Sequence, residues 1–507
     1  MYKKLTLLYT SQAYKALLPI IFIPLIIKDL GEEQYGMVSF FSMLLGWLGV
    51  LDAGVSGTFI KLVTTSKHNK FSFEKSCNLF FKILRWFLVV SATLSISIFL
   101  FANYISTEWL KTKIEANEAI DCIRTIGLSL SLNYLKIYLS SFLNGMEKQH
   151  LLAGWSIASS TALYAGSYGA IFLDGEALLN YFYAVLFISA LDLSVIAAML
   201  FLTIRQNRHK LEKQLELQAD EPDGNLSIHH VFQFSLQLSG LSIIWVIATQ
   251  IDKLILSRYV ALNDYAHYQI AAQLSMLIPV FISPLSQYLM PRLSALHKEN
   301  KSTELIRHLA FFLLFFIVLI GPVPFYFFLL GEHFISAWIQ NQQLGNEINL
   351  YAKWLVASSY IGALMNFMFI LRYALDLLKK YFYAYAMYSA VTIPISIMIA
   401  KYWGAESSAQ FLFAHSFLFM STWGAWSMHK IASGVMTLVA SASAFVSTIS
   451  FLIFYIFSQI SANDSYSNFL IKVAAPPIIN FFVIISILWL FKNNLWIRLD
   501  RCRIRVA

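Results

Sequence analysis

The sequence is poor in charge and in cysteine. Only 13% of its 507 residues are Asp, Glu, Lys or Arg, whereas soluble domains carry about 25% charged residues. So few charged side chains cannot cover the water-exposed surface of a chain this long, and the composition excludes an ordinary soluble protein. The three cysteines, Cys77, Cys122 and Cys502, have no CxxC spacing, which argues against a disulfide framework or a thiolate metal site.

Motifs of catalysis are missing as well. The chain contains no GxxxxGK[ST], HExxH, GxSxG or GxGxxG pattern, and these are the signatures of phosphate-binding loops, zinc proteases, serine hydrolases and dinucleotide sites. The longest predicted outer connection, 331–350, is short and amphipathic, unlike the large catalytic loop of a membrane glycosyltransferase or polymerase. We therefore predict a protein that is not an enzyme, needs no cofactor and transports its substrate without hydrolysing ATP directly.

Long apolar runs make up most of the chain. Hydrophobic residues account for 58% of the sequence, and the mean hydropathy is +0.63. A spanning helix needs about 20 apolar residues, and the runs predict an all-α, polytopic membrane protein with about 14 transmembrane helices. The first run is too long for a signal peptide and lacks a small-x-small cleavage site, so we interpret it as a retained helix. The predicted helices are 5–27, 35–63, 79–105, 119–142, 150–173, 177–204, 231–254, 264–290, 308–330, 350–373, 381–401, 407–428, 431–458 and 469–491.

Basic residues gather in alternate connections, which sets the predicted orientation. By the positive-inside rule, the connections rich in Lys and Arg face the cytoplasm, and so do both termini. The stretch KDLGEEQYG, 28–36, then forms an outer turn in which Gly31 and Gly36 supply backbone freedom. The basic connections contain Lys3, Lys4, Lys67, Lys70, Lys75, Lys148, Arg205, Arg208, Lys210, Lys213, Arg292, Lys298, Lys301, Arg307, Lys379, Lys380, Lys430, Arg498, Arg501, Arg503 and Arg505.

Two pairs of similar stretches indicate an internal duplication. An offset of 230 residues aligns the first outer turn with the one after 231–254, and an offset of 232 aligns 140–160 with 372–392. Because six helices separate the copies, both enter the membrane from the same side, as in parallel transporter repeats. The alignments place Lys28 on Arg258, Tyr35 on Tyr265, Gly36 on Ala266, Asn144 on Asp376 and Lys148 on Lys380.

The duplication predicts two parallel six-helix repeats followed by two additional C-terminal helices. The charged stretch between the repeats combines a short surface helix with a Pro/Gly-containing hinge. The predicted parts are an N-terminal six-helix lobe (1–204), a cytoplasmic linker (205–230), a C-terminal six-helix lobe (231–430), two additional helices (431–491) and a basic cytoplasmic tail (492–507).

Charged residues inside the predicted spans are the candidate site. A charge at a helix centre costs about 2.5–3.5 kcal/mol on insertion scales, so it usually faces a bundle interior or water. Lys15 lies about 15–18 Å from either end of its helix, and it either lines a polar cavity or forms an ion pair with Asp52 or another acid. Arg124 either lines the cavity or reaches the outer interface.

The remaining intramembrane charges lie nearer to predicted helix ends, where a long side chain can reach the membrane surface. This is the interpretation we favour for Arg85, Lys136, Lys353 and Arg372. Three acids, Asp52, Asp192 and Asp252, and Lys253 complete the set. The excess of cations predicts a cavity that attracts negative groups such as a lipid diphosphate or acidic sugars.

Short motifs resemble those of one transporter family. LGEEQYG followed by a helix ending LDAG, within 30–54, NDYAHYQIAAQL at 263–274 and PRLSAL at 291–296 are similar to segments of polysaccharide and O-antigen flippases. These form the polysaccharide-transport branch of the multidrug/oligosaccharidyl-lipid/polysaccharide exporter superfamily. One departure is Ala266, where the first repeat has Gly36.

The resemblance implies a flippase of the bacterial cytoplasmic (inner) membrane that serves polysaccharide or lipopolysaccharide biosynthesis. Such proteins move an undecaprenyl-diphosphate-linked oligosaccharide, such as an O-antigen repeat unit, between leaflets by alternating access of a V-shaped pair of lobes around a cationic cavity. Its partners are the lipid-linked oligosaccharide, membrane lipids and a polysaccharide polymerase, without nucleic acid. Asp52 is then the LDxG acid, and the substrate-binding candidates are Lys15, Arg124, Asp52, Arg85 and Lys136.

Three other functions remain open. A lipid II flippase would use the same kind of cavity, and related lipid II flippases have two added C-terminal helices. The superfamily that the motifs resemble also contains multidrug and small-cation antiporters. For such an antiporter we would expect carboxylates in the core and about twelve helices. A membrane glycosyltransferase or polymerase requires an outer catalytic loop, which the sequence does not show.

Overall fold

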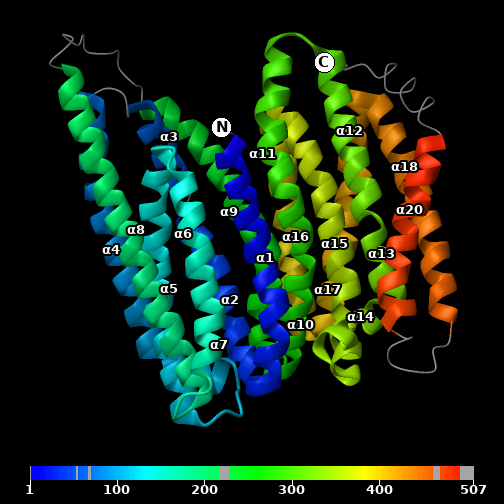
Figure 1. Cartoon of the computed structure of the whole chain (residues 1–507), viewed down its shortest axis with the longest axis horizontal. Coiled ribbons are helices and arrows are strands. Elements are labelled where there is room, and N and C mark those ends of the chain that lie inside the picture. The colour runs from blue at the N-terminus through cyan, green and yellow to red at the C-terminus, as the bar shows by residue number, and fades with distance from the viewer. Residues whose placement is uncertain (1, 53–54, 67–69, 216–227, 461–468, 491–507) are drawn as a thin grey trace. The chain divides into compact units, whose positions relative to one another are not determined.

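A computed structural model describes residues 2–52, 55–66, 70–215, 228–460 and 469–490, and every regular element in these ranges is a helix (Figure 1). The chain divides into two compact units, Met1–Ala266 and His267–Ala507. The boundary falls inside one helix, α10 (Leu262–Ser275). The all-α fold class predicted from the sequence is confirmed.

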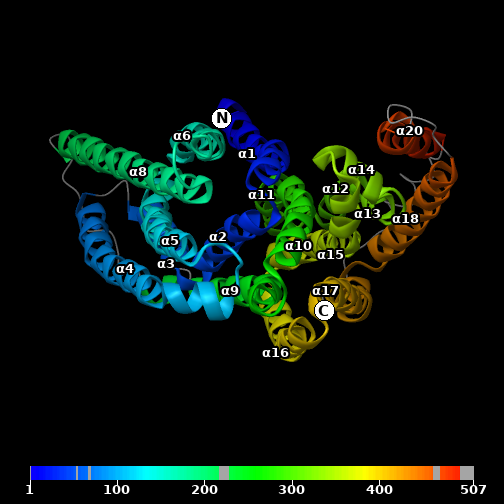
Figure 2. The same cartoon turned by 90° about the horizontal axis from the view of Figure 1, so that it is seen from below.

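The first unit is built around α5, which packs against α3, α4 and α8 (Figure 2). α1 lies beside α6, and α9 lies beside α2 and α3. The helices of this unit are α1 (Tyr2–Leu30), α2 (Glu32–Leu51), α3 (Val55–Ser66), α4 (Lys70–Tyr104), η1 (Ile105–Trp109), α5 (Ala116–Gly145), α6 (Gln149–Thr161), η2 (Ala162–Gly166), α7 (Ser167–Ala170), α8 (Ala177–Leu215) and α9 (Ile228–Tyr259).

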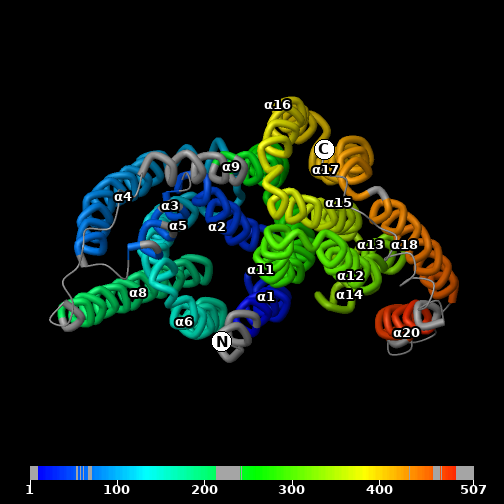
Figure 3. The backbone as a smooth tube through the Cα atoms, turned by 90° about the horizontal axis from the view of Figure 1, so that it is seen from above, coloured from blue at the N-terminus to red at the C-terminus, as the bar shows by residue number. Residues whose placement is uncertain are grey.

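The second unit is built around α15, which packs against α11, α14 and α17 (Figure 3). After α10 its helices are α11 (Leu277–Lys298), α12 (Ser302–Ile320), α13 (Pro322–Leu329), α14 (Gly331–Ile339), α15 (Gln342–Ala374), α16 (Leu378–Tyr402), α17 (Gly404–Phe419), η3 (Met420–Gly424), α18 (Ala425–Gln459), η4 (Phe469–Ala474) and α20 (Ala475–Leu490).

Eight helical segments among the described residues are long and apolar enough to cross a membrane. Their outer faces are apolar as well as exposed: Trp86 is 64% exposed, Leu100 71% and Phe187 70%. Large apolar patches open to solvent are rare in soluble proteins, so these faces fit a lipid surround. The predicted helical segments lie largely within helices of the structure, apart from the divisions described next, and the full count of about 14 spans stays a prediction.

The predicted helix 35–63 comprises two described helices. α2 ends at Leu51, and α3 begins at Val55, with residues 53–54 outside the described residues. Asp52 contacts the start of α3, because its Oδ1 accepts hydrogen bonds from the Ser56 hydroxyl (2.6 Å) and the Ser56 N–H (3.3 Å). These bonds satisfy the first turn of α3 as an N-cap side chain does. The predicted helix 264–290 is likewise divided, between α10 and α11 at Met276.

The predicted linker begins as helix. α8 continues through 205–215 without interruption, as the last part of a 39-residue helix. Residues 216–227 of the linker and the basic tail 492–507 lie outside the described residues, as does Cys502. Cys77 and Cys122 are buried free thiols.

The outer turns have similar backbones at the positions that the first repeat alignment pairs. α2 begins at Glu32 and α10 at Leu262, an offset of 230 residues. Tyr35 and Tyr265 are both buried, and each donates its N–H to the carbonyl four residues back, at 3.1 and 2.9 Å. The same backbone turn therefore places the same buried tyrosine in both copies.

The inner turns correct the second alignment by three residues. Glu147 and Asp376 both adopt φ +57°, and the residue after each donates its N–H to the carbonyl five residues back, at 3.0 and 2.8 Å. This is the geometry of a Schellman helix end. The true offset is 229, so the predicted pairings of Asn144 with Asp376 and Lys148 with Lys380 are wrong. Side-chain similarity misled the alignment, because the turn is defined by backbone conformation.

The two glycines of the first turn have different roles. Gly31 has φ +87°, the left-handed region that glycine enters at little cost, as predicted. Gly36 lies within α2 instead, and a Cβ there would stand 2.6 Å from the carbonyl oxygen of Leu262. Gly36 therefore permits close helix contact, and the predicted backbone freedom at this position is wrong.

We expect Gly36→Ala to destabilise the protein by about 1–3 kcal/mol, the usual cost of overpacking. The matched control is Gly154→Ala in α6, where an added Cβ meets nothing within 4 Å and a gain of up to about 1 kcal/mol is expected. Unfolding of both purified variants, followed by heat or denaturant, makes the comparison. Equal stability of the two variants would contradict the close contact at Gly36.

Candidate functional site

An ion pair joins two helices inside the first unit. Lys136 of α5 places its Nζ 3.0 Å from Asp192 Oδ2 of α8, and Trp155 of α6 donates its Nε1–H to Asp192 Oδ1 at 2.6 Å. Both carboxylate oxygens are thus engaged, by groups from two other helices. The carboxylate of Asp192 is held in one orientation between α5, α6 and α8.

The two partners differ in exposure. The Asp192 side chain is 12% exposed and the Lys136 side chain 31%. Lys136 lies nine residues before the end of α5, about 14 Å along the helix axis, so its ammonium group is within the span. The sequence predicted that Lys136 reaches the membrane surface. In the structure it forms an ion pair with Asp192 instead, and its side chain remains partly accessible.

Lys15 of α1 belongs to the same group of charges. Its side chain is exposed, and the ionised groups that act on it are Lys136 and Asp192. The sequence left open a cavity or an ion pair with an acid for this residue, and the structure brings it near Asp192. We call Lys15, Lys136, Trp155 and Asp192 the lysine–aspartate cluster.

Hydroxyl pairs fix the face of α1 that carries Lys15. Ser11 bonds to Ser156 and Tyr14 to Thr161, both at 2.8 Å between oxygens. Residues three and four apart share a helix face, so these bonds orient Lys15 on the side of α1 that meets α6. Asn133 adds a further polar contact beside the cluster, since its amide donates to Ser189 Oγ at 3.1 Å.

Arg124 lies away from the lysine–aspartate cluster. Its guanidinium pairs with Asp121 at 3.0 Å and stands 4.6 Å from the centre of the Phe99 ring. It precedes Lys136 by twelve residues on α5, about 18 Å along the axis. With 42% of its side chain exposed, Arg124 fits the outer-interface alternative better than a shared cavity.

The other two predicted site residues also lie elsewhere. Asp52 is buried and caps α3 through Ser56, which is a structural role. Arg85 is exposed on α4. Of the five predicted site residues, only Lys15 and Lys136 are brought together. Asp192 appears in the sequence as an intramembrane acid, whereas no sequence signal marked Trp155, because one indole among many interfacial aromatics looks ordinary.

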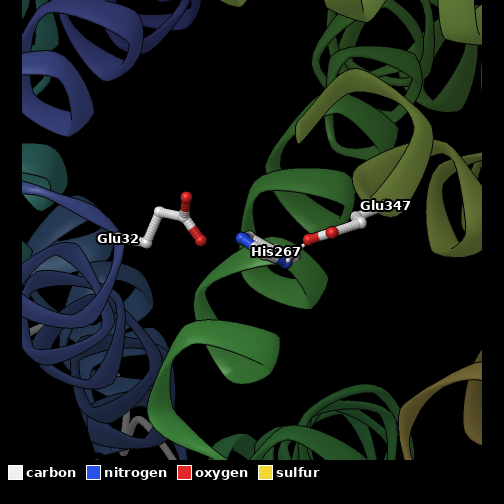
Figure 4. A group of neighbouring side chains, drawn as sticks. All are labelled: Glu32, His267 and Glu347. Carbon is white, nitrogen blue, oxygen red and sulfur yellow. Dashed lines mark ion pairs between the residues drawn. The ribbon is translucent and has the colours of Figure 1, made fainter. Parts of the chain in front are cut away.

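Further charges inside the helices are paired locally. Lys253 and Asp252 of α9 are buried neighbours 3.7 Å apart, and Lys253 Nζ also donates to the Thr249 carbonyl. In the second unit, His267 of α10 lies 3.3 Å from Glu347 of α15 (Figure 4). Lys353 is half-buried in α15.

The fold is that of a class of membrane transporters. An inward closed structure of the lipid II flippase MurJ matches with a TM-score of 0.67 at 15% identity, covering 97% of this chain and 100% of that one. An inward-facing multidrug resistance MATE family transporter of the MOP superfamily matches with a TM-score of 0.59 at 12% identity, over 90% and 96% of the two chains. A mutant of the Vibrio cholerae MATE transporter VcmN gives 0.55 at 12% identity, over 87% and 96%.

The sequence itself defines the family. Residues 1–297 match the polysaccharide biosynthesis protein family, and the chain belongs to it. No match was found among curated proteins. The family and the fold together class the chain as a multi-pass membrane protein of polysaccharide biosynthesis with a transporter fold, and not as an enzyme.

A double-mutant cycle tests the ion pair of the cluster. We expect Lys136→Met and Asp192→Asn to show a coupling free energy of about 0.5–3 kcal/mol, because each change leaves the other charge without its partner. The matched control is the exposed pair Arg124 and Asp121, for which we expect less than about 1 kcal/mol. Unfolding measurements on the singles and doubles provide both values, and a smaller coupling for Lys136 and Asp192 than for the control would refute the pairing.

Proposed function

We propose that this protein is a flippase that translocates an undecaprenyl-diphosphate-linked oligosaccharide, an O-antigen or similar repeat unit, across the bacterial cytoplasmic membrane. The observation that carries the proposal is the lysine–aspartate cluster, which places two lysines and one carboxylate inside one unit of a transporter fold. Membership of the polysaccharide biosynthesis protein family supports the glycan as cargo.

The chemistry of the cluster suits a diphosphate. Ammonium groups bind phosphate oxygens by charge-assisted hydrogen bonds, which are stronger than neutral ones. Lys15 is exposed and Lys136 keeps part of its surface, so both can reach a ligand. Asp192 acts as the counter-ion of Lys136 in the absence of substrate. An arriving diphosphate competes with this carboxylate for the lysine.

The proposed transport cycle follows from the predicted topology. Both termini lie in the cytoplasm, and about 14 helices form two parallel six-helix lobes, 1–204 and 231–430, joined by a linker and followed by two helices. The lobes give alternating access to the cationic site, driven by an ion gradient or the membrane potential and without a cofactor. Membrane lipids and a polysaccharide polymerase are the expected partners.

A lipid II flippase is the second candidate. It is favoured by the match to the whole length of MurJ and by the helices that follow α17. α18 and α20 pack against each other, and Asn480 of α20 donates to Ser450 of α18 at 3.1 Å between buried groups. A cluster with two cations and one anion disfavours export of cationic drugs, because like charges repel.

Complementation tests the proposed function. Expressed in a strain that lacks its O-antigen flippase, the chain is expected to restore surface glycan, and Lys15→Ala and Lys136→Ala are each expected to reduce it at least about tenfold, the effect of losing one charged hydrogen bond. The matched control is Lys82→Ala, which removes an exposed lysine of α4. Protein level in the membrane is measured for each variant.

Two results would count against the proposal. Full activity of the double variant Lys15→Ala and Lys136→Ala would show that the cluster does not bind substrate. Failure of the unaltered chain across several glycan backgrounds, with rescue of a strain depleted of its lipid II flippase, would favour the second candidate.

A further inference from the structure

Arg372 is a buried arginine at the end of the central helix of the second unit. It lies in the last turn of α15 and is 5% exposed. Its Nε and Nη2 both donate to the hydroxyl of Ser427 in α18, the first at 3.0 Å, and its guanidinium carbon stands 4.8 Å from the centre of the Trp423 ring. The guanidinium is thus held between a hydroxyl and an indole.

The contacts of Arg372 leave its charge without an acid. Among the described residues, the ion pairs do not include Arg372, and its buried Nη1 has no hydrogen-bond partner. A buried ion without a partner costs several kcal/mol, and a buried donor that makes no hydrogen bond costs about 1–3 kcal/mol. The Ser427 hydroxyl and the face of the Trp423 ring offset only part of this free-energy cost.

The corresponding helix end of the first unit carries no arginine. At the offset of 229, the position of Arg372 in the first unit is occupied by Leu143, which is fully buried. An apolar side chain therefore fills the equivalent place at the end of α5. The helix end itself therefore does not call for an arginine, which leaves room for a ligand of its unpaired donor.

The surroundings of Arg372 suit a lipid headgroup. The first turn of α16 carries the exposed Lys379 and Lys380, and the first turns of α18 carry the exposed Trp426 and Lys430, whose Nζ lies 5.5 Å from the Trp426 ring centre. Lysines and tryptophans at a helix end are typical of the membrane–water interface. The buried arginine therefore lies close in sequence to a basic, interfacial surface.

We propose that Arg372 binds the phosphate of a membrane lipid. Nη1 is covered in this structure, so side chains around it move before a phosphate oxygen accepts from it and supplies the missing negative charge, while Ser427 and Trp423 hold the guanidinium plane. Arginine suits this role because its planar donors match phosphate geometry. The lipid is either an anionic phospholipid or the prenyl diphosphate of a transported substrate. The first does not depend on the proposed flippase activity, whereas the second rests on it.

Lipid binding to the purified full-length protein tests this site. Native mass spectrometry and thermal stability are measured with phosphatidylglycerol, with phosphatidylcholine and with inorganic diphosphate. The variants are Arg372→Gln and Arg372→Lys, and the matched control is Arg292→Gln, an exposed arginine of α11. We expect phosphatidylglycerol to bind the unaltered protein and the control alike, and Arg372→Gln to weaken it by about tenfold or more, with a smaller loss for Arg372→Lys.

The ligands separate the two sources of phosphate. Preference for phosphatidylglycerol over inorganic diphosphate identifies a phospholipid site, whereas tighter binding of diphosphate, lost in Arg372→Gln, identifies a site for a diphosphate headgroup. If the unaltered protein neither binds nor is stabilised by phosphatidylglycerol or diphosphate, the proposal fails even where Arg372→Gln does not fold. Equal lipid binding by folded Arg372→Gln and the unaltered protein overturns it as well.

Discussion

The ion pair between Lys136 and Asp192 is the constraint on which the account of the first unit depends. It ties α5, the central helix of that unit, to α8, and Trp155 adds α6 through the same carboxylate. A charged pair within a span is costly unless each charge has a partner. The pair therefore stabilises the helix packing only while it is intact, and a ligand that takes Lys136 from Asp192 alters the contacts between three helices.

The duplication explains why the two units share a frame while their charges differ. The same left-handed residue closes α5 and α15, at Glu147 and Asp376, and each of these helices lies at the centre of its unit. At the same offset, Lys136 corresponds to Met365 and Arg372 to Leu143. Each central helix thus carries two cations. At this offset Arg124 of α5 aligns with Lys353 of α15, whereas Lys136 and Arg372 have no charged counterpart in the other unit.

The sequence predicted the helices, the outer turn of the repeat and part of the candidate site. Length and hydropathy report burial in lipid directly, and this is why the helical segments were found. The end of α2 at Leu51 was missed because one cap interrupts an apolar run without changing its composition. Arg124 and Arg85 lie apart from Lys15 in the structure. An intramembrane charge is visible in the sequence, but its neighbours on other helices, and the pairing of Arg124 with Asp121 one turn away, are not.

The central claim is that a lipid diphosphate competes with Asp192 for Lys136. The most direct test is the affinity of the purified protein for undecaprenyl diphosphate, measured for the unaltered chain, Asp192→Asn and Lys136→Met. The account predicts opposite signs: Asp192→Asn binds more tightly because the competing carboxylate is gone, and Lys136→Met binds less tightly. Weaker binding by both variants, or no change in either, would contradict it.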